Sequence, residues 1–522
     1  MTPKKSKWGD DLTLGPASDE GSPPPPAPDR ISALPDTLRI HILALLPYKS
    51  AVRACSVSAS WRRLLAHRWP HPSRLHLVPT SPSSAASFSR HVDLLLLLLL
   101  SRGTHARRHD LLRISAPASS VSHSDLRRWL DYAAATSVSD LSVDLADGPT
   151  LFYLKFWAHK RDADAEADAD ETAVIPAGAE YEDGVENPSL VRLSLSHLSL
   201  ILPPGPAFKN FPNLESLNLT SIKLVDVDLA RMVMSCPILR TLEVRGCPRL
   251  RRVLVPGPAE RLDSILVVDC PRVTSIVVEA MNVKKFHFLG NHVTEFSLDE
   301  VLDLKDVYIS CGWQEMGLPR ADWMEALVGL RRVRVLTLCS LALQCITVSS
   351  AGTHEEFRNF HNLKELQLVM LMMTKTNLLD IVDFFRLCDC PNLEKLFLEL
   401  PTHMYDPYVE NFFDATKEAP LPENFFFNLK IVRINNFNGH QYEMQLVRFL
   451  LSKAIYLESL IIVVPPECPA RGESSKTASC QLYNLRVQLS QIAEPYSKPQ
   501  IVVTEHDDYR VRPTHFGIGC KV

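Results

Sequence analysis

Apolar and polar residues follow a recurring LxxLxL pattern through most of the chain. The last two apolar positions alternate with a polar one, so both side chains lie on the same face of a short strand. The first apolar residue lies three positions earlier and is expected to anchor the turn that enters the strand. The pattern therefore predicts a series of short, similar strands. Its copies begin at Leu190, Leu214, Leu239, Leu262, Val283, Leu304, Val333, Leu363, Leu393, Leu429 and Leu457.

The spacing of the copies predicts what connects the strands. From Leu190 to Leu239 the steps are 24 and 25 residues, which leaves room for a strand and a helix. Between Leu239 and Leu304 a match falls every 10 to 12 residues, which is too close for a helix. We expect coils of about 21–23 residues there, with a strand on each flank. After Leu304 the steps lengthen to 29 and 30 residues, and helices are expected again, for example over 378–387.

Several copies extend to the longer consensus of leucine-rich repeats. Cys247, Cys270 and Asn291 fall on its Asn/Cys position, where a side chain can bond to backbone groups of the loop that leaves the strand. Repeats of this kind stack so that each one covers the apolar edge of the next, and both ends of the stack need caps. The sequence therefore predicts an α/β fold, a leucine-rich-repeat solenoid.

Residues 29–70 carry helical rather than strand periodicity. A first helix is expected between Pro35 and Pro47, a second after Ser50, and a third around Trp61. Three short helices bury little apolar surface, so such a unit usually needs a partner or a neighbouring domain to complete its core. The apolar positions of the first helix, spaced for one face, are Leu38, Ile42, Leu45 and Leu46.

The remaining segments lie between and beside these two regions. Seven leucines at 94–100 are far too few to span a membrane, which needs about 20 apolar residues, and are expected to form a buried helix. Strands are expected at 111–114 and 141–145, with a helix between them at 125–135. The ten acidic residues of 161–186 cannot form a packed face, so we expect an exposed acidic loop, with a regulatory tract as the alternative.

Composition narrows the class of molecule. Apolar residues make up 46% of the 522 positions, and leucine supplies 75 of them, which is enough for a large core. The formal net charge of −4 gives no bulk electrostatic reason to bind nucleic acid or an anionic membrane. The twelve cysteines form no CxxC pair, and no apolar segment follows the first residues. We therefore expect a soluble intracellular protein with reduced thiols.

The motifs of common enzyme classes are absent. The sequence has no GxSxG, HExxH, GxGxxG or P-loop motif, so we expect no catalytic, cofactor-binding or metal-binding residue and no enzymatic activity. Cys388 and Cys390 lack the spacing of a zinc knuckle and are expected to be core thiols. Two arginine clusters are expected to be solvated, with a basic patch for an acidic or phosphorylated target as the alternative. They are Arg249, Arg251 and Arg252, and Arg331, Arg332 and Arg334.

The helical unit resembles the F-box of plant F-box/leucine-rich-repeat proteins. The motifs that carry the resemblance are DRISALPD at 29–36, IL at 42–43, LP at 46–47, Lys49, AVR at 51–53 and WRRL at 61–64. Ala59 and Ser60 depart from it, because the family usually has two basic residues there. Residues 439–460 resemble the FBD segment that many of these proteins carry. The implied domains are a disordered tail at 1–28, an F-box at 29–70, a helical connector at 71–108, repeats at 109–437, an FBD-like cap at 438–505 and a tail at 506–522.

The resemblance implies a substrate-recognition subunit of an SCF-type ubiquitin ligase. The three-helix F-box would dock a Skp-type adaptor, and through it a cullin, while the repeats would bind a protein substrate in the cytoplasm or nucleus. Adaptor contact is expected at Leu34, Pro35, Leu38, Ile42, Leu43, Leu46, Pro47, Val52, Val57 and Trp61. Each of these side chains has the alternative of filling the core of the unit, although contact is favoured for Leu34 and Pro35, which precede the first helix. The alternative for the whole chain is a repeat scaffold with a non-functional F-box.

Overall fold

The computed structural model describes residues 34–46, 50, 53–55, 58–67, 74–79, 85–101, 109–145, 153–155, 189–202, 211–298, 300–312, 323, 329–351, 359–371, 375–401, 425–465, 475–496, 499–505 and 511–516. The tail expected at 1–28, the acidic loop expected at 161–186, and Pro47, Val52 and Val57 lie outside these residues. The chain divides into two compact units, residues 1–72 and 73–522, and each is described by itself.

Two helices pack against each other in the first unit. Helix α1 (Asp36–Leu45) begins after Pro35, whose fixed φ suits the entry of a helix. Helix α3 (Ala59–His67) follows, and residues 53–55 are also helical, within the segment where the second helix is expected. The first and third predicted helices are thus present. Their core consists of Leu43, Cys55, Trp61 and Leu64.

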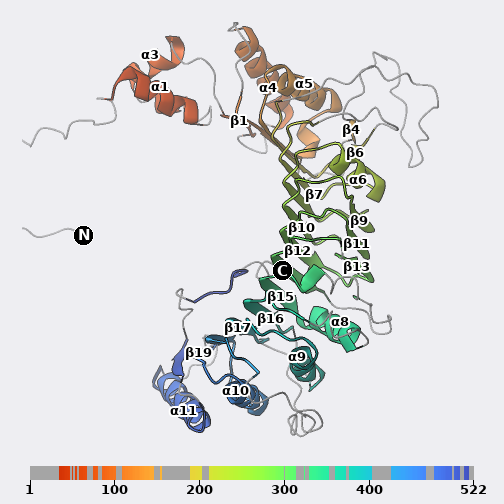
Figure 1. Cartoon of the computed structure of the whole chain (residues 1–522). Helices are drawn as coiled ribbons and strands as arrows, with labels where there is room; N and C mark the ends of the chain where they lie inside the picture. The colour runs from red at the N-terminus through yellow and green to blue at the C-terminus, as the bar shows by residue number, and fades with distance from the viewer. Residues whose placement is uncertain are drawn as a thin grey trace, which may run out of the picture. The chain divides into compact units, whose positions relative to one another are not determined.

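The second unit is built on a large parallel sheet. Fifteen strands of the described part of the chain pair in chain order, and Figure 1 shows them stacked one above another. They are β1 (Arg74–Leu77), β2 (Leu111–Ser115), β3 (Asp140–Asp144), β5 (Arg192–Ser196), β7 (Ser216–Thr220), β8 (Thr241–Arg245), β10 (Ser264–Val268), β12 (Lys285–Gly290), β14 (Asp306–Cys311), β15 (Val335–Cys339), β16 (Glu365–Val369), β17 (Lys395–Glu399), β18 (Ile431–Asn435), β19 (Ser459–Val463) and β20 (Gln500–Thr504).

The apolar positions of the repeats stack in register, as their spacing predicts. Leu193 of β5 pairs with Leu217 of β7, which pairs with Leu242 of β8, and the series continues to Leu460 of β19. All of these side chains are buried. The first apolar residue of most repeats closes a turn, as when the Leu363 amide donates to the Phe360 carbonyl at 3.0 Å. The LxxLxL pattern therefore predicted the strands and their inward faces correctly.

A second sheet replaces helices where the repeats are short. Its three parallel strands are β9 (Arg252–Val255), β11 (Ser275–Val278) and β13 (Glu295–Ser297), and they alternate along the chain with β8, β10, β12 and β14. This confirms coils with a strand on each flank. The Asn/Cys position acts as expected, since the Cys270 thiol donates to the Val244 carbonyl at 3.9 Å and the Asn291 amide to the Pro271 carbonyl at 3.0 Å.

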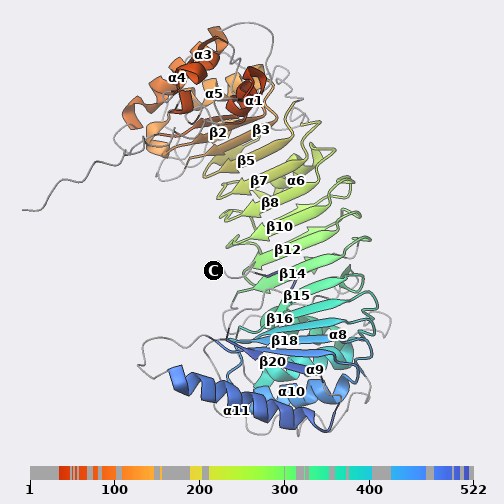
Figure 2. The same ribbon diagram turned by 90° about the vertical axis from the view of Figure 1, so that its left-hand side faces the viewer.

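Helices lie beside the sheet where the repeats are longer. Helices α6, α8 and α9 lie on the same side of the stacked strands as β9, β11 and β13 in Figure 1, and Figure 2 shows the ladder of strands from the opposite side. The helices of this unit are α4 (Ala85–Ser101), α5 (His123–Ala135), α6 (Asp226–Met234), α8 (Ser340–Ala351), α9 (Lys375–Leu387), α10 (Gln441–Lys453) and α11 (Ser475–Ala493), with a 3-10 turn η2 (Ala118–Ser120). A short pair, β4 (Tyr153–Lys155) and β6 (Ser199–Ile201), completes the described elements.

Two expectations about the first part of this unit were wrong. The leucine run lies on α4 but is not wholly buried: Leu94 and Leu97 are 54% and 62% exposed. A uniform run has no polar face, and only the side of α4 that carries Leu96 and Leu99 is covered. The sheet also begins earlier than residue 109, because β1, within the expected helical connector, pairs with β2. No helix among the described residues is both long enough and apolar enough to cross a membrane.

The stacked leucines should carry most of the stability of the sheet. We expect Leu336→Ala, at a fully buried position of β15, to lower the free energy of unfolding by about 2–5 kcal/mol, because the cavity lies between two paired strands. Leu97→Ala on α4 is the matched control, and its effect should stay within about 0.5 kcal/mol. Urea denaturation of the full chain measures both. Equal shifts for the two variants would contradict the assignment of the core.

Candidate functional site

The first candidate surface is the exposed side of α1. Leu38 and Leu45 are 50% and 49% exposed, and Ile42 between them is half-buried. These positions follow i, i+4 and i+7, so they form one apolar stripe along the helix. The sequence placed the same residues together but did not show which side of the stripe is covered. An apolar stripe that the unit itself leaves half open is a surface that a partner can bury.

The predicted adaptor-contact residues divide into two groups. Leu43 is fully buried and Trp61 is 6% exposed, so both belong to the core of the unit. Leu34, Ile42 and Leu46 are half-buried, while Pro35 and Leu38 are exposed. Leu45 was not predicted as a contact, although its exposure matches that of Leu38; its place in the apolar spacing was the only signal for it.

Polar contacts fix the angle between the two helices. Arg39 of α1 pairs with Asp36 one turn earlier and donates to the Ser60 hydroxyl of α3 at 3.1 Å. The Ser58 and Ser60 hydroxyls are 3.0 Å apart. Ser60, which departs from the family pattern, therefore has a local role that joins α1 to α3. Inside the unit, burial raises the pKa of the Cys55 thiol, partly opposed by Arg62, and this thiol contacts the Trp61 carbonyl at 3.4 Å.

The second candidate surface is the open face of the large sheet. The position between the two inward apolar residues is in register on every strand of this sheet, so the residues at this position form a single row across it. The row consists of His76, Arg113, Ser142, Ser194, Asn218, Glu243, Leu266, His287, Tyr308, Thr337, Gln367, Phe397, Arg433, Ile461 and Val502. Because the repeat leaves this position free of the core, its side chain can differ from one repeat to the next.

The row is open in its first half and covered in its second. From Arg113 to His287 the side chains are exposed or half-buried, whereas from Tyr308 to Ile461 all are buried. Residues 511–516 lie on this face and cover part of the row. The tail expected at 506–522 therefore packs against the sheet over residues 511–516. They carry no periodic pattern, so no local signal linked them to the sheet.

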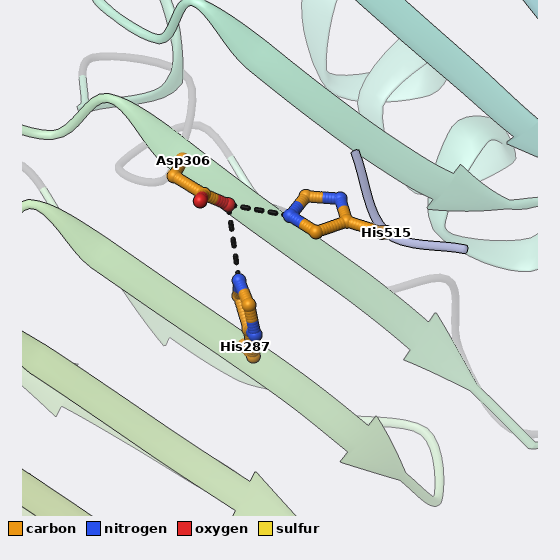
Figure 3. A group of neighbouring side chains, drawn as sticks. All are labelled: His287, Asp306 and His515. Atoms are coloured by element: carbon orange, nitrogen blue, oxygen red, sulfur yellow. Dashed lines mark hydrogen bonds and ion pairs between the residues drawn. The ribbon is translucent and has the colours of Figure 1, made fainter. Parts of the chain in front are cut away.

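Residues 511–516 are held by side chains from four strands. The Thr514 amide donates to Glu365 of β16 at 2.5 Å, and Arg433 of β18 donates to the Val511 carbonyl at 2.5 Å. The buried His515 ring contacts Thr337 of β15 through Nδ1 at 2.8 Å. Its Nε2 lies 2.5 Å from a carboxylate oxygen of Asp306 on β14. Figure 3 draws this contact as a dashed line.

Asp306 is the electrostatic centre of this contact. His287 of β12 also directs Nε2 at the same oxygen, at 3.0 Å, and Lys285 lies 3.4 Å from the other oxygen. Burial opposes ionisation of Asp306, but the hydrogen bonds and charges of the two histidines outweigh it and hold the pKa of the carboxyl well below its usual value. The group is therefore a carboxylate at neutral pH.

A cavity of about 550 Å³ lies beside the bound segment. Its lining includes Tyr308, Gln367 and Glu399 from the sheet and His515 and Phe516 from the segment. Burial raises the pKa of the Glu399 carboxyl, and the Arg433 charge only partly offsets this. The cavity is thus completed by residues far apart in the chain.

The cysteines of the described residues behave as core thiols. All nine that can be placed are buried and unpaired by disulfides. Cys388 and Cys390 are among them, and burial holds the pKa of the Cys390 thiol well above its usual value. This confirms the interpretation of the Cys-Asp-Cys sequence as part of the core. Of the arginine clusters, Arg249, Arg251 and Arg252 are exposed, as expected for solvated side chains.

Two domain models of known families match this chain. An F-box domain model matches residues 31–72, and a leucine-rich-repeat domain model described as At1g61320/AtMIF1 matches residues 183–494. The chain is 24% identical over 452 residues to the putative F-box/FBD/LRR-repeat protein At4g03220 of Arabidopsis thaliana, covering 81% of this chain and 86% of that protein. It is also 24% identical over 463 residues to the Arabidopsis thaliana F-box/FBD/LRR-repeat protein At1g78750, covering 83% and 89%.

The repeat-domain match spans more than half of the chain, and the F-box match falls on the helical unit. The protein therefore belongs to the At1g61320/AtMIF1 leucine-rich-repeat family and is a plant F-box/leucine-rich-repeat protein with an FBD-like segment.

Proposed function

We propose that the protein is the substrate-recognition subunit of an SCF-type ubiquitin ligase. The helical unit docks a Skp-type adaptor, and through it a cullin, while the open face of the sheet binds a protein target. The observation that carries the proposal is the half-exposed apolar stripe on α1, within the segment that the F-box model matches. In this role the chain acts inside the cell, in the cytoplasm or nucleus.

The contribution of such a subunit is proximity. Holding a target on the same assembly as the ubiquitin-carrying enzyme raises the effective concentration of target lysines at the transfer site. No group of this chain has to take part in the transfer itself, so the protein is a non-catalytic subunit. The surface that binds the adaptor and the surface that binds the target can then change independently of each other.

We assign adaptor contact to the exposed side of α1 and its entry. Pro35, Leu38 and Leu45 expose apolar surface that the adaptor would bury on docking. Leu34, Ile42 and Leu46 border these residues. Leu43 and Trp61 support the contact indirectly, because their burial holds α1 against α3. Target recognition is assigned to the open half of the row, from Arg113 to Leu266, where each repeat offers a different side chain.

The contact assignment predicts that Leu38→Ala combined with Leu45→Ala weakens adaptor binding without unfolding the unit. Both leucines are half exposed and alanine favours the helix, so α1 should stay intact. Removing two apolar anchors should weaken the affinity for a Skp-type adaptor by about 10- to 100-fold. Binding of the purified full chain to immobilised adaptor measures this, with Leu97→Ala as the matched exposed-leucine control.

Two results would count against the proposal. If the wild-type chain does not bind the adaptor under conditions where a working F-box does, the chain is a repeat scaffold with a non-functional F-box. If the double variant binds as tightly as the wild type, the stripe on α1 is not the contact.

The core assignment predicts a different outcome for Leu43→Ala. This side chain is fully buried against Cys55, Trp61 and Leu64, so its truncation should cost about 2–5 kcal/mol, which is enough to unfold a small helical unit. Residues 34–67 should become sensitive to limited proteolysis, and adaptor binding should be lost together with the fold. A variant that keeps protease resistance but loses binding would place Leu43 in the contact instead.

A further inference from the structure

Two imidazoles and one carboxylate converge where the C-terminal segment meets the sheet. His287 lies on β12, Asp306 on β14, and His515 in the segment 511–516, and Figure 3 shows both rings directed at one carboxylate oxygen. The potential ligand atoms of the three residues all lie within 4.8 Å of one another. His515 is separated from Asp306 by 209 positions, so only the return of the chain to the sheet assembles the group.

The hydrogen-bond partners of His515 show which of its ring nitrogens faces Asp306. The Thr337 hydroxyl donates its single hydrogen to the Gln367 amide oxygen at 3.2 Å. The contact between Thr337 and His515 Nδ1, at 2.8 Å, therefore requires the ring to donate from Nδ1. A neutral ring then presents the Nε2 lone pair to the Asp306 oxygen at 2.5 Å. A proton on Nε2 satisfies this contact as a hydrogen bond, whereas a metal ion in its place would hold the two atoms about 3 Å or more apart.

We propose that His287, Asp306 and His515 bind a divalent transition-metal ion of the Zn²⁺ type, which fastens the C-terminal segment to the open face of the sheet. Two imidazole nitrogens and a carboxylate oxygen are a donor set that suits such ions. To bind one ion at about 2.0–2.1 Å, His515 Nε2 and the Asp306 oxygen would separate slightly and the two ring nitrogens would turn toward a common point. In this group of described residues no fourth His, Cys, Asp or Glu is present, so water completes the coordination.

The neighbours of the three ligands already orient them as a metal site requires. Thr337 accepts from His515 Nδ1 and so leaves Nε2 free to coordinate, and Lys285 pairs with the second Asp306 oxygen at 3.4 Å. The Tyr308 ring packs edge-on against His515, with ring centroids 5.5 Å apart, and limits access of solvent. The two histidine rings are themselves nearly perpendicular, with centroids 4.8 Å apart.

The ion would have a structural consequence that goes beyond the proposed ligase role. Two of its ligands belong to neighbouring strands and the third belongs to the segment, so binding links residue 515 to the sheet. The Thr514 amide, which donates to Glu365, lies next to this link. Removing the ion should therefore loosen residues 511–516 and uncover part of the row from Tyr308 onward.

The test is metal binding by the full chain, purified without a histidine tag and stripped with a chelator. Titration with Zn²⁺ should show that each chain binds one ion tightly. Co²⁺ in place of Zn²⁺ should give the visible absorption of a site with few ligands. Asp306→Asn and His515→Gln should each weaken Zn²⁺ binding by about tenfold or more. His91→Gln, which changes an exposed histidine on α4, should leave it unchanged. Because residue 515 lies outside the strands, His515→Gln should leave the midpoint temperature of thermal unfolding of the sheet unchanged.

Hydrogen exchange at the Thr514 amide gives a second readout, independent of the first. It should be slow with Zn²⁺ and at least tenfold faster after chelation in the wild type, and fast under both conditions in His515→Gln. Equal protection with and without Zn²⁺ would show that a proton alone bridges His515 and Asp306, which overturns the proposal. If Asp306→Asn and His515→Gln both still bind one Zn²⁺ ion tightly, the ion binds elsewhere and the proposal is overturned as well.

Discussion

The structure depends on one constraint: a coil of this chain can bury its apolar positions only against the coils on either side. Leu193, Leu217 and Leu242 pair directly across neighbouring strands, and a shift of one residue would turn each of them to the opposite face. The register is therefore held by burial along the whole sheet. The same constraint explains why connections can vary from β9-type strands to helices such as α8 without disturbing the strands, since both cover the same inward side.

A fixed register also determines where function can reside. Once the inward positions are committed to the core, the position between them forms a continuous row on the other face, and its chemistry is free to differ from repeat to repeat. In this chain the row passes from Asn218 and Glu243 to the aromatic and basic side chains of Phe397 and Arg433. The buried Arg433 is tolerable because it is bonded to Asn435 and to the carbonyl of Val511. The C-terminal segment thus uses the row as a binding surface within the same chain.

The sequence predicted what depends on local periodicity and missed what depends on distant contacts. The strands, the short coils between Leu239 and Leu304 and the role of Cys270 follow from spacing, because each repeat carries its own signal. The leucine run of α4 has no polar residues to mark its exposed side, so its half burial was not predictable. The place of His515 was not either, because its partners on β14 and β15 are fixed only when the sheet has formed.

The helical unit shows the same limit at a smaller scale. With 3.6 residues per turn, Leu38, Ile42 and Leu45 lie along one side of α1 and Leu43 on another, and an apolar sequence alone does not say which side faces the core. Burial separates them: a four-residue core accounts for Leu43, and no part of the described unit covers Leu38 or Leu45 fully. Leu38 and Leu45 are apolar yet about half exposed, as expected of a surface that is completed on binding. The open half of the row on the sheet is subject to the same reasoning, because its polar side chains add nothing to the core that the leucines already form.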